Sequence, residues 1–239
     1  SETLRSDTIR PSNVRIGKGD DMAKNTLKEQ AYSIIKENII NCTYAPSSFL
    51  VESELMQQVG ASRTPIREAL NKLEQENLVR ILPKRGVLVC DITMGTLNVV
   101  YEVRRLVEPY IVREYGCRLD EEALRREYEQ VEQSAQLPTG MQLHRVDNDL
   151  HQMLLNVSGN SYLRAMMDNI YGHNNRIRVF SGMKVAERRS DTCKEHLEIL
   201  RLLLERDYER AAQAMLTHLE NSKQTAVRAL LAAGTPSRT

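Results

Sequence analysis

Histidine and acidic residues recur in the second half of the chain at spacings that favour a metal site. Asp147 and His151 lie four residues apart, which would place both side chains on one face of a helix. His196 and His218 each lie beside the apolar positions of a predicted helix, so both are expected to point inward. One carboxylate and three imidazoles that converge in a helical bundle would suit a divalent ion such as Zn²⁺ or Ni²⁺. The alternative is a set of unrelated core histidines, each satisfied by its own hydrogen bonds.

Two further histidines and one arginine are the other candidates for chemistry in this half. His144 and His173 lie outside this pattern and are assigned no metal role, although His173 could face the same cavity. Arg104 lies on an otherwise apolar helix, where a side chain that is always charged could bind an anionic group of a ligand. Its alternative role is an ion pair with Glu108, which lies four residues further on.

Two arginines in the first third of the chain favour a different chemistry, the recognition of DNA. A capping hydroxyl, from Ser62 or Thr64, and the early Pro65 predict that a helix begins here. Arg63 and Arg67 lie four residues apart on one face of that helix, and a planar guanidinium can bond a guanine edge or hold a phosphate. Such a helix behind a tight turn is typical of a helix-turn-helix. The alternative is an amphipathic surface helix with a solvated arginine pair.

The residues around this arginine pair predict three helices and a β-hairpin. Two short β-prone runs follow the third helix, and the turn between them carries Lys84 and Arg85. Three helices followed by a hairpin with a basic tip make a winged helix-turn-helix. Positive charge gathers there, because residues 61–88 carry six basic and three acidic side chains, whereas residues 26–60 carry two basic and four acidic ones. The helices are expected over 27–41, 52–59 and 63–75, and the strands over 78–82 and 86–90.

Helical periodicity continues through the rest of the chain, which predicts an all-α bundle with room for an internal site. The separators are polar or glycine-containing breaks such as Ser158-Gly159-Asn160. The fold class is therefore mainly α. The bundle helices are expected over 94–116, 120–135, 139–156, 160–181, 185–205 and 207–232. The predicted organisation is a flexible tail over 1–25, the winged domain over 26–93, the helical domain over 94–233 and a flexible tail over 234–239.

Composition is that of a folded protein, with 41% hydrophobic and 27% charged residues and a net charge of +1. No apolar run approaches the ~20 residues that span a bilayer, and no signal-peptide hydrophobic region stands at the N-terminus. The four cysteines are scattered, with no Cys-x-x-Cys pair, as reduced cysteines would be. We therefore expect a cytoplasmic protein with no membrane partner.

The run from Gly60 to Leu70, with Glu54-Leu55-Met56 before it and Pro83-Lys84-Arg85-Gly86-Val87 after it, resembles the DNA-binding domain of GntR-family bacterial transcriptional regulators. The resemblance covers about residues 26–92. It departs from the family where glycines usually flank the first-helix turn, which here are Cys42 and Ser47, and at the usual polar helix cap, which here is Val51. The resemblance implies a DNA-reading set of Ser62, Arg63, Thr64, Arg67, Lys84, Arg85 and Gly86.

The second half resembles the FCD ligand-binding domain of the FadR-type subgroup of that family. The Asp-x-x-x-His pair is followed by one histidine on each of the last two helices, and Tyr101-Glu102-Val103-Arg104 is similar to the opening helix of the domain. The resemblance implies one divalent metal ion per chain, Zn or Ni, whose open positions bind the carboxylate of a small organic acid, with Arg104 beside it. The implied ligands are Asp147, His151, His196 and His218.

These patterns lead to one main interpretation and two alternatives. The main one is an effector-responsive transcriptional regulator, most simply a repressor, that binds a palindromic double-stranded DNA operator as a homodimer, because one recognition helix contacts only a few base pairs. The first alternative is a metal-dependent enzyme with an accessory DNA-binding domain, against which no nucleophile or general base stands beside the four ligands. The second is a helical scaffold without a ligand.

Overall fold

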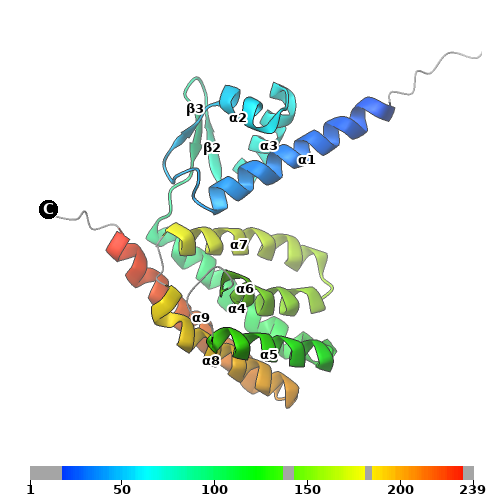
Figure 1. Cartoon of the computed structure of the whole chain (residues 1–239), viewed down its shortest axis with the longest axis vertical. Coiled ribbons are helices and arrows are strands. Elements are labelled where there is room, and N and C mark those ends of the chain that lie inside the picture. The colour runs from blue at the N-terminus through cyan, green and yellow to red at the C-terminus, as the bar shows by residue number, and fades with distance from the viewer. Residues whose placement is uncertain (1–17, 137–142, 181–184, 234–239) are drawn as a thin grey trace, which may run out of the picture.

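The computed structural model describes the backbone of residues 18–136, 143–180 and 185–233, and the side chains of residues 26–135, 148–180 and 190–232. Figure 1 shows two units: an upper one of helices and a small sheet, and a lower bundle of helices. Within the described ranges, no helix is both long and apolar enough to cross a membrane. The predicted mainly α class, a winged helix-turn-helix followed by a helical bundle, is confirmed.

The upper unit contains the three predicted helices and the predicted hairpin. The helix α1 begins at Lys18, earlier than expected, so residues 18–25 are helical rather than part of a tail. A strand that the sequence did not predict, β1, pairs antiparallel with β3, and the strand order is β1-β3-β2. The elements are α1 (Lys18–Ile40), β1 (Phe49–Leu50), α2 (Glu52–Val59), α3 (Arg63–Gln75), β2 (Val79–Leu82) and β3 (Gly86–Val89).

An apolar core fixes α3 against α1 and the sheet. Ile66 and Leu73 are fully buried on the inner face of α3, and Ile35 of α1 is buried with them. The helix α2 ends at Gly60 in the left-handed region, and Asn77 in the same region follows the end of α3, both as predicted. Each helix in the motif therefore has a defined end, and the outer face of α3 is left to solvent.

The turn after α1 keeps a left-handed geometry without glycine. Cys42 has φ of 54° and Ser47 has φ of 63°, at the two positions where the sequence departs from the family's glycines. Val51 likewise caps α2 with no side-chain hydrogen bond. The backbone bonds Ser47 N to Val89 O and Val89 N to Ser48 O, at 3.0 and 2.9 Å, hold this turn against β3. Residues other than glycine are disfavoured at positive φ, so this turn lowers the folding stability and must be held in place by the surrounding structure.

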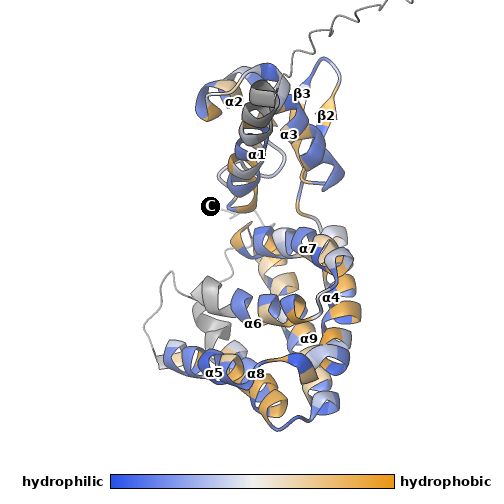
Figure 2. Ribbon diagram, turned by 90° about the vertical axis from the view of Figure 1, so that its right-hand side faces the viewer, coloured by the Kyte–Doolittle hydropathy of each residue, from blue (hydrophilic) through white to orange (hydrophobic). Residues whose placement is uncertain are grey.

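The lower unit is the predicted all-α bundle. The helices α4 and α9 pack against each other along their length, and apolar residues recur along both in Figure 2. Thr93 caps α4 by accepting a hydrogen bond from Thr96 N at 3.1 Å. The predicted start of α6 at 139 lies outside the described residues. The elements are α4 (Met94–Tyr115), the short 3₁₀ turn η1 (Gly116–Arg118), α5 (Glu121–Gln136), α6 (Leu143–Val157), α7 (Ser161–Phe180), α8 (Val185–Leu204) and α9 (Tyr208–Ala233).

The two units meet where α7 lies under α1 (Figure 1). An apolar cluster fills the junction, with Ile92 from the connecting segment and Ile177 from α7 buried beside residues of α4 and α9. Arg176, which is 1% exposed, donates a hydrogen bond to the Cys90 carbonyl. The bundle is thus fixed to the winged unit through α7.

Candidate metal centre and nucleic-acid interface

Three histidines from three different helices meet inside the bundle. His151 comes from α6, His196 from α8 and His218 from α9, and their exposed fractions are 3%, 1% and 1%. One ligand atom from each lies within 4.8 Å of the others. The ring centroids of His196 and His218 are 4.6 Å apart, and each lies 5.3–5.4 Å from that of His151. Three of the four residues predicted as metal ligands are therefore brought together.

The spacing of two nitrogens in this cluster fits a shared ion. The Nε2 atoms of His196 and His218 lie 3.3 Å apart. Two nitrogens that each bind one zinc ion at ~2.1 Å with a tetrahedral angle between them are ~3.4 Å apart. Three imidazoles converging in a buried place are also the donor type that borderline divalent metals prefer. The residues present therefore fit a divalent ion.

Two carboxylates contact the Nδ1 atoms of two of these imidazoles. Glu108 Oε2 lies 2.7 Å from His151 Nδ1, and Glu195 Oε2 lies 2.8 Å from His218 Nδ1. Glu195 is held in turn by Asn221, whose Nδ2 donates to Oε1 at 2.8 Å. A carboxylate that accepts from Nδ1–H leaves Nε2 for a metal and fixes the ring orientation, which is the usual support of a metal-binding histidine.

Sequence reasoning gave these supporting carboxylates no such role. From the sequence, Glu108 is expected to pair with Arg104 and resembles part of the opening helix of the FCD domain, and Glu195 has no assigned role. A signal was nevertheless present, since Glu195 directly precedes His196 and Asn221 lies three residues after His218. Asp147 lies on α6 one turn before His151, but its side chain is outside the described residues, as is that of His144. The fourth ligand therefore stays a prediction.

Arg104 forms one of the two interactions expected of it, and it also lies beside the histidine cluster. Its Nε donates to Glu108 Oε1 at 2.6 Å, so the predicted ion pair is present. Its Nη2 also lies 3.3 Å from His151 Nε2, which places the guanidinium at the edge of the histidine cluster. Burial alone would raise the pKa of Glu108, but the charge of Arg104 and the contact with His151 outweigh it and lower this pKa to about 2. A fixed cation thus stands beside the cluster.

The predicted DNA-reading residues all lie on the surface of the winged unit. Ser62 stands at the N-terminal cap position of α3 but makes no side-chain cap hydrogen bond, so the predicted capping hydroxyl is not seen there. Ser62 is exposed together with Arg63, Thr64 and Arg67 on the first turns of that helix. Lys84 and Arg85 are exposed in the wing between β2 and β3, as is Gly86 at the start of β3. Arginines near the start of an exposed helix, with a basic hairpin beside it, form the arrangement by which a winged helix meets the major groove and the phosphates.

His173 does not face the metal cluster. Its Nε2 lies 2.8 Å from the Glu76 carbonyl oxygen, and Glu76 is the C-terminal cap of α3. Burial lowers the pKa of His173, so the ring is neutral near neutral pH and its Nε2–H can donate to this carbonyl. The sequence allowed His173 to face the same cavity as the predicted metal ligands, but the side chain instead joins the bundle to the end of the exposed arginine helix.

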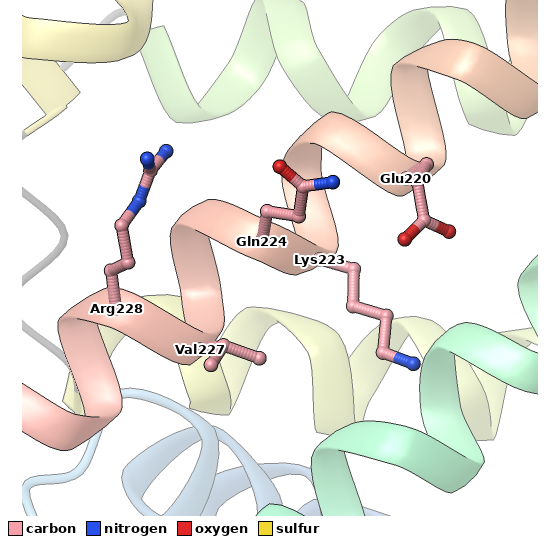
Figure 3. Close-up of a pocket in the computed structure, with 5 residues that line it drawn as sticks. All are labelled: Glu220, Lys223, Gln224, Val227 and Arg228. Atoms are coloured by element: carbon pink, nitrogen blue, oxygen red, sulfur yellow. The ribbon is translucent and has the colours of Figure 1, made fainter.

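A surface pocket lies elsewhere, on α9 (Figure 3). Its volume is about 320 Å³, and its lining combines an acidic residue, Glu220, with two basic ones, Lys223 and Arg228. None of the three clustered histidines lines it, so it is separate from the candidate metal centre.

Two family models match the chain, and together they cover both units. The model described as "Bacterial regulatory proteins, gntR family" matches residues 27–89. The model described as "FCD domain" matches residues 99–221. The winged unit and the histidine-bearing bundle thus correspond to the two matched regions.

Curated relatives and solved structures agree with these matches. The chain is 26% identical over 202 residues to the HTH-type transcriptional repressor RspR of Escherichia coli (strain K12), covering 83% of this chain and 88% of that protein. It is 30% identical over 181 residues to the Nta operon transcriptional regulator of Aminobacter aminovorans, covering 74% and 83%. Escherichia coli McbR/YncC has the same fold, with a TM-score of 0.72 and 19% identity over 84% of this chain and 97% of that one. So does a GntR regulator from Rhodococcus sp. RHA1, with a TM-score of 0.67 and 20% identity over 85% and 98%.

The similar proteins also decide between the functional alternatives. The two curated relatives named above are transcriptional regulators, and the model that matches the winged unit describes bacterial regulatory proteins, so the chain is a transcriptional regulator rather than a metal-dependent enzyme. Its two matched regions follow each other in the order expected from the sequence. The chain therefore belongs to the GntR family of bacterial transcriptional regulators, with a gntR-type winged helix-turn-helix at its N-terminal side and an FCD domain after it.

Proposed function

We propose that this regulator is a repressor that binds a palindromic operator as a homodimer, and that a small carboxylate effector bound at a metal site in the bundle controls its operator affinity. The observation that carries the proposal is the buried histidine cluster with Arg104 at its edge. RspR is named a transcriptional repressor, which supports repression rather than activation for this chain. Such a protein acts in the cytoplasm, where a bacterial operator lies.

The metal site would hold one divalent ion, Zn²⁺ or Ni²⁺, on His151, His196, His218 and Asp147. The inward Nε2 atoms and the carboxylates behind His151 and His218 support this assignment. When bound, such an ion would offer its open coordination positions to the carboxylate of a small organic acid.

Arg104 would select for a second anionic or hydroxyl group on the effector. Arg104 is 3% exposed, and its Cζ atom lies 5.6 Å from the ring centroids of both Tyr101 and Tyr171. This packing holds a permanent charge in a fixed orientation, which suits recognition of a carboxylate or a hydroxyl. Sugar acids, hydroxy acids and dicarboxylates are therefore the effector classes to test.

The DNA-reading surface would be the exposed face of α3 together with the wing. Arg63 and Arg67 would reach base edges, and Lys84 and Arg85 would contact phosphates. One α3 helix spans only part of an operator, so two copies related by a two-fold axis would read the two halves of a palindrome.

The helix α7 would connect the two sites. Tyr171 on α7 contacts the cluster helix α6, its hydroxyl 3.5 Å from the His151 carbonyl oxygen. His173, two residues further on, contacts the end of α3. A shift of α7 upon effector binding would therefore move the recognition helix, provided that the effector favours one arrangement over the other, typically by ~1–3 kcal/mol.

The test is operator binding in the presence of the three classes of acid, for the wild type and for His196→Ala. One acid should change the operator affinity of the wild type and have no effect on the variant. His144→Ala, which lies outside the proposed ligand set, is the control for replacing a histidine. An acid that shifts the wild type and His196→Ala equally would show that the metal site is not the sensor. A panel that shifts neither would remove the effector part of the proposal and leave the DNA-binding part.

A further inference from the structure

The two arginines on the recognition helix share one acidic partner on the preceding helix. Glu52, the first residue of α2, places its Oε1 3.1 Å from Arg67 Nε and its Oε2 3.5 Å from Arg63 Nε. The Arg67 Nε also lies 3.2 Å from Oε2. The Glu52 side chain is 25% exposed, whereas those of Arg63 and Arg67 are 66% and 60% exposed. The carboxylate thus lies at the base of the pair and the guanidinium groups extend outward from it.

The contacts of Glu52 involve one particular nitrogen of each arginine, and this choice indicates the role of Glu52. Both arginines approach the carboxylate through Nε, the inner nitrogen of the guanidinium. The two outer nitrogens together can bond O6 and N7 of a guanine. A carboxylate at Nε can therefore hold the plane and direction of the guanidinium while leaving its recognition edge available.

Folding stability does not account for this arrangement, because ion pairs between exposed side chains contribute little to it. Binding gives a better reason. A long arginine side chain loses rotamer freedom when it docks, and a side chain that is already oriented loses less. A carboxylate near the DNA surface also repels phosphates, which weakens binding to every sequence alike. The first effect favours the correct bases, and the second lowers the affinity for all sites, non-specific ones included.

We propose that Glu52 is a specificity-determining positioning residue. It holds Arg63 and Arg67 in the directions that reach base edges and lowers the affinity of the helix for non-specific DNA. This role rests on the proposed reading of DNA by the two arginines.

The experiment compares Glu52→Gln with Glu54→Gln. Glu54 also lies in the first turn of α2 and is exposed, so its replacement removes the same charge from the same helix end. The specific probe is a duplex selected from a randomised library by the wild-type protein, and the non-specific probe is an unrelated duplex of equal length. The dissociation constants of both probes are measured at several salt concentrations, and thermal unfolding checks that each variant is folded.

For Glu52→Gln we expect the ratio of specific to non-specific affinity to fall about fivefold or more, with tighter binding to the non-specific probe, because arginine orientation is lost and repulsion is relieved. Glu54→Gln should keep the ratio within about twofold, since it loses only charge. In an Arg63→Ala, Arg67→Ala background, Glu52→Gln should no longer change the ratio. Equal changes in the Glu52 and Glu54 variants, or an unchanged ratio in Glu52→Gln, would overturn the proposal.

The same measurements separate this inference from the proposed function. If Arg63→Ala and Arg67→Ala each weaken the specific probe while Glu52→Gln leaves the ratio unchanged, the arginines read DNA and Glu52 does not position them. If neither arginine variant weakens binding, or if the library yields no enriched duplex, the proposed DNA-reading surface is wrong and the role of Glu52 is wrong with it.

Discussion

His173 Nε2 lies 2.8 Å from the carbonyl oxygen of Glu76, so a side chain of the bundle caps the C-terminal end of the recognition helix α3. Beside it, Arg176 donates to the Cys90 carbonyl, and Cys42 Sγ lies 3.8 Å from the Arg176 carbonyl oxygen. These contacts join α7 to three parts of the winged unit: the turn after α1, the end of α3 and the segment after β3. Among these contacts, the His173 bond links α7 directly to the end of α3.

Replacing His173 by Ala is expected to reduce the coupling between effector and operator. The variant loses the hydrogen bond to the end of α3 but keeps the histidine cluster, so effector binding persists while the effector-induced change in operator affinity falls from ~1–3 kcal/mol towards zero. Operator titrations with and without effector measure this change. His173→Gln, which retains a donor amide, is the conservative comparison and should preserve more of the coupling. Full coupling in His173→Ala would exclude this contact as the connection.

The purified protein is expected to contain about one divalent ion per chain, and Glu195→Gln should weaken its binding. Losing a carboxylate that supports a metal-bound histidine typically lowers metal affinity ~10–100-fold. Glu198→Gln is the matched control, because Glu198 lies on the same helix and pairs with Arg201, 2.7 Å away. Elemental analysis gives the metal content, and chelator competition gives the affinity. Equal affinities in the two variants would argue against Glu195 as a support of the site.

The recognition helix and the wing should respond differently to salt. Arg67→Ala is expected to weaken operator binding by ~1–3 kcal/mol and to relax the base preference at one position. Lys84→Ala should weaken binding to all DNA sequences similarly. It should also reduce the slope of log affinity against log salt concentration by about one, because one phosphate contact is lost. Titrations of several duplexes at different salt concentrations separate the two effects. If Lys84→Ala changed the base preference, the wing would contact bases rather than phosphates alone.

Glu127 is expected to make the stability of the bundle depend on pH. Its side chain is buried, and its Oε1 has no hydrogen-bond partner among the described residues. Burial, together with the negative charge of Asp149, raises the pKa of Glu127 to about 7. Because this pKa is higher in the folded state, the stabilisation is present at low pH and is lost as pH rises from that of an unfolded glutamate to about 7.

Glu127→Gln should remove this dependence. The variant should be more stable than the wild type at pH ~8, by on the order of 2 kcal/mol, and nearly equal to it at pH ~5. Chemical denaturation of both proteins at the two pH values measures the difference. A stability difference that does not change with pH would mean that Glu127 does not titrate as described.

The turn after α1 offers a stabilising substitution. Ser47 has φ of 63°, which glycine adopts without strain, so Ser47→Gly should stabilise the fold by up to ~1 kcal/mol. Ser48→Gly is the control, because Ser48 is not at positive φ and its Oγ donates to the Ala45 carbonyl at 2.6 Å. It should destabilise the fold. Thermal unfolding of the three proteins gives the order, and a lower melting temperature for Ser47→Gly would contradict the strain argument.

The sequence by itself determined the elements and the residue types at the two sites. The helices of both units, the hairpin, the outward arginines of α3 and the inward histidines follow from local periodicity, because spacing along a helix fixes which side chains share a face. It also identified the left-handed Asn77 and the glycine that ends α2. The start of α1 at Lys18 was missed because residues 18–25 lack an apolar pattern, and β1 was missed because two residues are too few to show a period.

Only the tertiary structure decided which of these residues meet. Each of three glutamates, Glu108, Glu195 and Glu52, contacts a residue on a different helix. Spacing along one helix does not predict a contact between two helices. His173 shows this most clearly: helical spacing left its direction open, and the docking of α7 under α1 turned it to the recognition helix instead of the ligand site. Local patterns determine the face on which a residue lies, whereas its partner depends on how the faces pack, which is a property of the whole chain.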